Sequence, residues 1–199
     1  MVLVELTSVP DTALPVQDLR DHLRLSTGFA DGGAEDAHLE LCLRSAMSTI
    51  EARTGKVLLT RPFRWSLTAW RDLARQALPI APVSAITSLR IIDQGGTTTT
   101  ADPSVYRLVP DAHRPQLVSV SLVLPSIPVG GSAEIDFDAG YAADWTGVPA
   151  NIAQATIHLA AFLYEHRLDG AGGPVALPPT VTTLIEPYRE MRIFGGGAK

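Results

Sequence analysis

The stretch from Pro149 to Leu168 constrains the fold of this chain more than any other. Its apolar residues recur at steps of three and four, the period of one helix face: Ile152, Ala155, Leu159, Phe162 and Leu163. Pro149 stands near the start, where proline's missing N–H leaves no helical hydrogen bond unmade. Burying each large side chain would contribute about 1.5 to 3 kcal/mol. We therefore predict a helix over residues 149–168 that needs a partner surface elsewhere in the chain.

Three other segments carry the same helical period and can supply that surface. Residues 35–54 form the longest, with apolar positions at Leu39, Cys42, Leu43, Ala46, Met47 and Ile50. Residues 180–194 form another, in which Pro187 is expected to bend the helix. A short helix is predicted over residues 15–25. Together these segments predict a small bundle of about four helices.

The segment between the second and third helices, residues 57–140, has the alternating period of β-strands instead. Phe63, Trp65 and Leu67 alternate with polar residues, as in a strand with one buried face. Further strands are predicted over residues 86–91, 105–109, 117–124 and 133–139, whereas the threonine run 97–100 is expected to be a loop. The fold class is therefore α+β, a helical bundle with an inserted antiparallel β segment.

The ends of the chain fall outside this predicted single domain of residues 15–194. Residues 1–14 are expected to form an extended arm, in which Val2, Val4 and Leu6 could alternate as a strand or belong to a flexible or partner-bound tail. Residues 195–199 are predicted to be a flexible tail because three of them are glycine.

Charge and cysteine content exclude several classes of function. The net charge of −5 does not supply the basic field that nucleic-acid binding needs. The single cysteine, Cys42, excludes an intramolecular disulfide framework and a multi-cysteine zinc site. No apolar run is long enough to span a membrane, and the N-terminus lacks the basic region of a signal peptide. We expect a protein that is made in the cytoplasm and does not contact membranes.

The usual sequence marks of catalysis and metal binding are missing. There is no G-x-S-x-G motif, and Cys42 lies on an apolar helix face where thiols are inert. His158 and His166 are two helical turns apart, which is not the spacing of a chelating pair. We therefore predict no catalytic, cofactor-binding or metal-binding residue. A small hydrolase using Asp136, Asp138 and His166 stays as a weak alternative, because a solvated strand face explains the carboxylates by itself.

The order of short motifs along the chain resembles a known family. The first landmarks are LRDHLRL at 19–25, Glu35-Asp36, IEARTG at 50–55 and LPIAPV at 78–83. The later ones are Tyr106, FDAGY at 137–141, Val148-Pro149, YEHR at 164–167 and PYR at 187–189. Over about residues 15–192, this series resembles the tailed-phage head-tail connector, or adaptor, family, which includes adaptors of gene transfer agents.

The resemblance implies a structural protein without cofactors. Members of this family form a ring, typically of twelve subunits, beneath the portal of a capsid, where the ring extends the DNA channel and docks the next neck protein. DNA would pass through without specific binding. The chain would be made in the bacterial cytoplasm and end in the neck of a virion or virion-like particle. A stopper or tail-completion protein of the same neck is the alternative.

Six residues are candidates for the contacts of such a ring. Aromatic residues and arginine are enriched in interface cores, which favours Trp70, Arg71, Tyr188, Arg189, Arg192 and Phe194. Trp70 fits a core position equally well, because large aromatic side chains are commonly buried. The resemblance also implies that the C-terminal segment from Tyr188 to Lys199 docks on the portal.

Overall fold

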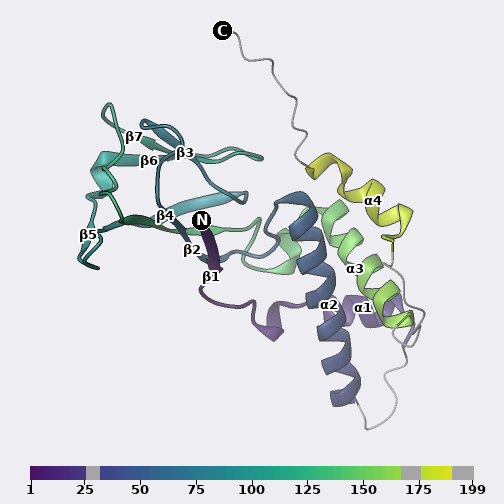
Figure 1. Cartoon of the computed structure of the whole chain (residues 1–199). Helices are drawn as coiled ribbons and strands as arrows, with labels where there is room; N and C mark the ends of the chain where they lie inside the picture. Colours follow the sequence, from purple (N-terminus) through teal and green to yellow (C-terminus); the bar gives the residue numbers. More distant parts are fainter. Residues whose placement is uncertain (26–31, 167–175, 190–199) are drawn as a thin grey trace.

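The chain has an α+β fold with four α-helices and two antiparallel sheets in a computed structural model that describes residues 1–25, 32–166 and 176–189 (Figure 1). The helices are α1 (Val16–His22), α2 (Gly32–Thr54), α3 (Ala150–Glu165) and α4 (Pro179–Ile185). Helix α3 lies between α2 and α4 and packs against both, and α1 contacts α2 and α3 (Figure 1). The helix predicted over residues 149–168 was expected to need a partner surface, and the other three helices supply it.

Seven strands lie between α2 and α3, and an eighth precedes α1. The strands are β1 (Val2–Glu5), β2 (Arg61–Leu67), β3 (Arg75–Ala77), β4 (Val83–Ile92), β5 (Thr98–Thr100), β6 (Tyr106–Val109), β7 (Gln116–Ser119) and β8 (Ser132–Ala139). The larger sheet has the order β1-β2-β8-β4-β5 and the smaller one the order β3-β7-β6. All pairings between these named strands are antiparallel, as predicted, and β8 forms the centre of the larger sheet.

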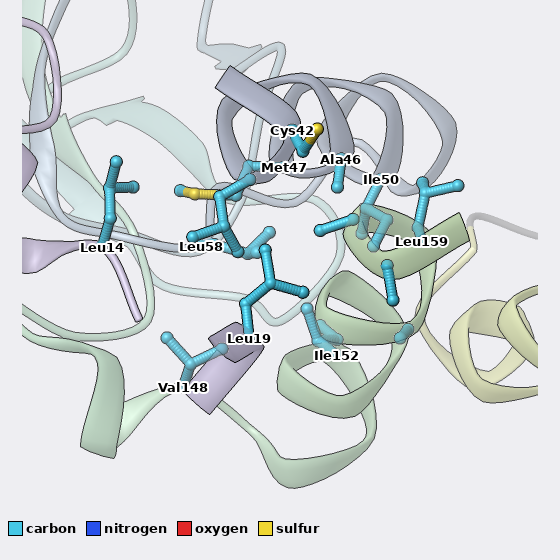
Figure 2. Close-up of a cluster of buried hydrophobic side chains, with 14 of the residues drawn as sticks. Leu14, Leu19, Cys42, Ala46, Met47, Ile50, Leu58, Val148, Ile152 and Leu159 are labelled. Carbon is cyan, nitrogen blue, oxygen red and sulfur yellow. The ribbon is translucent and has the colours of Figure 1, made fainter. Parts of the chain in front are cut away.

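The helices enclose one hydrophobic core. Leu19 of α1, Leu43 of α2 and Ile152 of α3 are fully buried in it. Figure 2 shows how Leu19 and Ile152 approach the α2 side chains Met47 and Ile50, with Leu58 and Val148 closing the core from the connecting segments. Cys42 belongs to this core as well, as its place on the apolar face predicted.

The sheets enclose a second core. Phe63, Trp65 and Leu67 of β2 face it, and on β8 every second residue from Ala133 to Ala139 is buried. In register, Phe63 lies opposite Phe137, and their rings stack with centroids 6.0 Å apart. Leu117 of the smaller sheet is also buried in this core. The period-2 pattern therefore selected the buried face of β2 and β8 correctly.

Polar contacts join the helical part to the sheets at the end of α2. Glu51 accepts hydrogen bonds from both terminal nitrogens of Arg61, at 3.1 and 2.8 Å, and from the N–H of Leu58 at 2.9 Å. Lys56 is fully buried, and its Nζ donates to the carbonyl of Ala112 at 2.6 Å. Gly140, with φ of +143°, lets β8 return against the backbone of Thr60, which a Cβ would approach to 2.4 Å.

Three sequence-based expectations differ from the structure. Thr98–Thr100, expected to be a loop, forms β5 on the edge of the larger sheet because its backbone pairs with β4. The short strand β3 has no alternating pattern to reveal it. The last helix does not continue through Pro187, since α4 ends at Ile185 and a 3₁₀ turn, Glu186–Tyr188, follows.

The structure also gives more exact bounds for two other predicted segments. The N-terminal arm is a strand in its first part, because β1 pairs with β2 from Val2↔Ser66 to Glu5↔Phe63. The predicted strand over residues 117–124 ends at Ser119, where the chain enters a compact turn.

Candidate assembly surfaces

Trp70, the first candidate contact residue, lies where β2 leads into the smaller sheet. Its ring is half-buried against the core of the sheets, and its Nε1 donates to the carbonyl of Pro125 at 2.8 Å. This hydrogen bond fixes the indole and satisfies its N–H. Trp70 therefore contributes to the core and also offers part of its ring to the surface.

Arg71 follows in an ordered turn and is exposed. Its backbone N–H donates to Oε1 of Gln76 at 2.9 Å, and the N–H of Ala74 donates to Asp72 at 2.8 Å. The buried Gln76 amide therefore holds the backbone of this turn, whereas Arg71 itself is exposed. Such an arrangement presents a cation to a partner from a backbone that is already ordered, so binding has to order only the side chain.

Tyr188, at the end of the 3₁₀ turn after α4, is half-buried against Tyr141. The two rings meet edge to face with centroids 6.3 Å apart, and burial, with Tyr188 nearby, raises the pKa of Tyr141 to about 12. Arg189 is exposed and pairs with Glu186 at 3.1 Å. Two other candidates, Arg192 and Phe194, lie outside the described residues.

The outer face of the larger sheet carries a charged network. Asp136 on β8 accepts hydrogen bonds from Arg64 on β2, at 2.8 and 3.1 Å, and from Arg90 on β4 at 2.9 Å. Glu134 pairs with Arg90 at 3.0 Å. Burial alone would raise the pKa of Asp136, but the hydrogen bond from Arg64 and the two guanidinium charges hold that pKa below its ordinary value.

This geometry does not favour acid/base chemistry. Asp136 is held ionised between two arginines, so it is poorly suited to donate a proton at neutral pH. His166 lies in the helical part, at the end of α3, where its ring stacks on Phe162 with centroids 4.0 Å apart. No contact between described residues joins His166 to Asp136 or Asp138, so the structure does not assemble the weak hydrolase alternative.

Within residues 1–25, 32–166 and 176–189, no three His, Cys, Asp or Glu side chains are grouped so that they could hold a metal ion. Cys42 is buried, with its Sγ 4.0 Å from Nε2 of His38. In the same ranges, no helix has the length and apolar character needed to cross a membrane.

Sequence reasoning missed a set of exposed apolar residues. Among the described residues, eleven large apolar side chains are exposed, and nine of them fall into two groups. One group surrounds β1 and consists of Met1, Val2, Leu3, Val4 and Leu6. The other consists of Leu73, Val120, Leu122 and Val123, beside the smaller sheet. Val120, Leu122 and Val123 of the second group were hidden because residues 117–124 were interpreted as one strand.

Comparisons with known proteins fall into two kinds. No family model matches the chain, and no curated protein matches it. Solved structures do match: a chain in the neck of an empty GTA particle, computed with C6 symmetry, shares 52% identity and a TM-score of 0.89 over 98% of this chain and 99% of that one. A chain in the virion of a native gene transfer agent shares 52% identity with a TM-score of 0.86 over the same coverage.

The chain belongs to the family of gene transfer agent neck proteins. A third member, from the neck of a native GTA particle computed with C12 symmetry, shares 46% identity over 98% of this chain and 99% of that one, with a TM-score of 0.85. These relatives are structural components of a particle, so the chain is a structural protein and not an enzyme. The resemblance inferred from the short motifs is thereby confirmed.

Proposed function

We propose that this protein is the head-tail adaptor of a gene transfer agent or phage-like particle. The observation that carries the proposal is the near-complete match to chains in GTA necks, at up to 52% identity. In this role the helices form the structural bundle, and the inserted sheets and the chain ends supply the contacts with neighbours. The protein assembles in the bacterial cytoplasm and then resides in the neck.

The proposed assembly is a ring of twelve copies beneath the portal. The neck of the native GTA particle was computed with C12 symmetry and that of the empty particle with C6 symmetry, and both are compatible with a closed ring of twelve. A closed ring provides a channel, and the net charge of −5 suits a channel through which DNA slides without specific binding.

The C-terminal segment is the proposed portal-docking element. Tyr188 starts this segment and is held by its edge-to-face contact with Tyr141. Arg189, Arg192 and Phe194 have the chemistry of interface anchors. Trp70 and Arg71 are proposed to contact a neighbouring copy or the next neck protein.

Pull-down experiments with the portal protein and with tail-side neck proteins test this role. The full-length chain is expected to retain the portal. A variant that lacks residues 190–199 keeps the Tyr141–Tyr188 contact, so it should fold and melt like the full chain but lose portal binding by about tenfold or more.

The matched control for the truncation is Arg53→Ala, which removes an exposed cation on α2 and should leave portal binding unchanged. A truncated chain that still binds the portal as the full chain does would refute the docking element. A full-length chain that retains the tail-tube protein and not the portal would instead identify a stopper or tail-completion protein.

A further inference from the structure

Two groups of apolar side chains are exposed on the described surface. We define the β1 cluster as Met1, Val2, Leu3, Val4 and Leu6, whose side chains alternate between the two faces of the sheet at its edge, and the Leu122 cluster as Leu73, Val120, Leu122 and Val123. In the described helices, by contrast, Leu41 is the large apolar residue that is exposed. Monomeric proteins rarely expose several neighbouring apolar side chains, so each cluster indicates a contact surface.

The β1 cluster lies on an open strand edge. Strand β1 is the first strand of the larger sheet, and no strand of the described ranges pairs with its outer side. The N–H of Leu6 donates to the carbonyl of Pro62 at 2.9 Å, so alternate residues of β1 bond to β2. The backbone groups of Leu3 and Glu5 therefore point outward. Such an edge accepts another chain unless it is protected, and β1 has no proline and only Glu5 as a charged residue.

The Leu122 cluster is held in a fixed shape by one hydroxyl. The Oγ of Ser119 donates to the carbonyl of Val123 at 2.7 Å and accepts from the N–H of Ser121 at 3.1 Å. The N–H of Leu124 donates to the carbonyl of Leu73 at 2.7 Å, which ties Leu73 to this turn. Leu122 is 88% exposed although its backbone is ordered by these bonds. The cluster is thus preorganised, which lowers the entropic cost of docking.

We infer that the Leu122 cluster of one copy packs against the β1 cluster of the next copy around the ring. This inference rests on the proposed ring. Neighbours in a ring meet through two different surfaces of the same chain, and these two clusters hold nine of the eleven large apolar side chains that the described residues expose. The carboxylate of Glu5, which lies within the β1 cluster, is paired with Arg61 at 3.1 Å, so covering this cluster does not bury an unpaired carboxylate. A second copy of this chain is therefore the occupant of each cluster.

Disulfide cross-linking in assembled particles tests the pairing. In a Cys42→Ala background, which removes the one native cysteine, Leu3→Cys or Val4→Cys is combined with Leu122→Cys. Oxidation of purified particles should yield a ladder of covalent oligomers of this chain. The matched control combines Leu3→Cys with Leu41→Cys, whose residue is exposed on α2, and should yield no ladder.

A ring that is present in the particles but yields no ladder with either pair, or a ladder equally strong with the Leu41 control, overturns the inference and leaves the proposed function intact. Absence of the unaltered chain from the particles would instead refute the proposed function. The two failures are therefore distinguishable by measuring the amount of chain in the particles first.

Introducing opposite charges into the two clusters gives a second, independent test. Leu122→Glu should reduce the number of copies per particle by about tenfold or more, while Val129→Glu, at a residue that is 97% exposed and outside both clusters, should not. Combining Leu122→Glu with Leu3→Lys should restore incorporation. Unchanged incorporation of Leu122→Glu would contradict the pairing, as would failure of the lysine to rescue a variant whose melting temperature is unaltered.

Discussion

The helical part and the sheet part of this protein differ in how completely they cover their own apolar surface. The helical core collects residues from four separate stretches of chain, from Val9 near the N-terminus to Ile185 in α4. The core of the sheets comes from the continuous segment between Val57 and Ala139. Of the eleven exposed large apolar residues in the described ranges, Leu41 is the one that lies on a helix, and the rest belong to strands and loops.

This difference separates a scaffold from an assembly surface. The helices bury one another's apolar faces, and polar contacts cover the outside, such as those of Arg20 with Glu35 and Asp36. The sheets and the N-terminal strand leave apolar clusters for partners. The contacts that join the two parts, above all Glu51 with Arg61, then determine how firmly the assembly surface is held on the scaffold.

The largest expected effects come from the two cores. Phe137→Ala should lower the free energy of unfolding by about 3 to 5 kcal/mol and Leu43→Ala by about 2 to 5 kcal/mol, because both side chains are fully buried. Denaturant unfolding followed by circular dichroism and by tryptophan fluorescence measures both changes. Coincident transitions would mean that the two parts unfold as one unit, whereas a separate early transition in Phe137→Ala would sharpen the distinction between scaffold and sheets.

A smaller effect is expected at the junction. Glu51→Gln removes the charge that pairs with Arg61, whose side chain is only 10% exposed. It should lower the free energy of unfolding by about 1 to 3 kcal/mol. The control Glu186→Gln breaks the exposed pair with Arg189 and should change the unfolding midpoint little. Equal effects from the two substitutions would show that the junction contributes nothing special.

The smallest expected effect is a dependence on pH within the helical part. Burial, together with the nearby His22 charge, lowers the pKa of His158 below its ordinary value of 6.5. The unfolded chain then binds a proton more readily than the folded one, so stability is full above pH 6.5 and falls as the pH drops through the folded-state pKa. Urea unfolding at pH 7.5 and 5.5 should show this loss.

His158→Gln should reduce the difference in the free energy of unfolding between pH 7.5 and pH 5.5. Protonation of Asp136 lowers the stability of the protein only at a more acidic pH than 5.5, because the pKa of Asp136 is below the ordinary carboxyl value of 3.8. A variant that loses as much stability as the unaltered chain between pH 7.5 and 5.5 would exclude His158 as the source.

Much of the fold was predictable because its elements follow from local periodicity. The apolar face of 149–168 and its need for partner helices, and the alternation in β2 and β8, are properties of single segments that burial then exploits. Strand β5 escaped prediction because three threonines have no alternating pattern, and its pairing depends on β4. The end of α4 depends on Pro187, whose effect was predicted as a bend and proved to be a stop.

The assembly surfaces were less accessible to sequence reasoning. Composition pointed to Trp70 as an aromatic anchor, but its hydrogen bond to Pro125 assigns part of that ring to the core. Residues 117–124, which include most of the Leu122 cluster, were predicted to form a strand. A hydrophobic pattern does not reveal hydroxyl-to-carbonyl hydrogen bonds such as that of Ser119, which shape the turn. Exposure is a property of the whole fold, so the Leu122 cluster could not be recognised before the sheets were in place, whereas a partner-bound N-terminal arm with Val2, Val4 and Leu6 was already one of the sequence-based alternatives.

A cryo-electron microscopy map of particles assembled with this chain, resolved to side chains in the neck, would show both the place of the protein and the contacts between its copies. We expect twelve copies in a closed ring in contact with the portal, with Leu122 of each copy against the β1 strand of the next. A map in which this chain is missing from the neck, or contacts the tail tube and not the portal, would contradict this expectation.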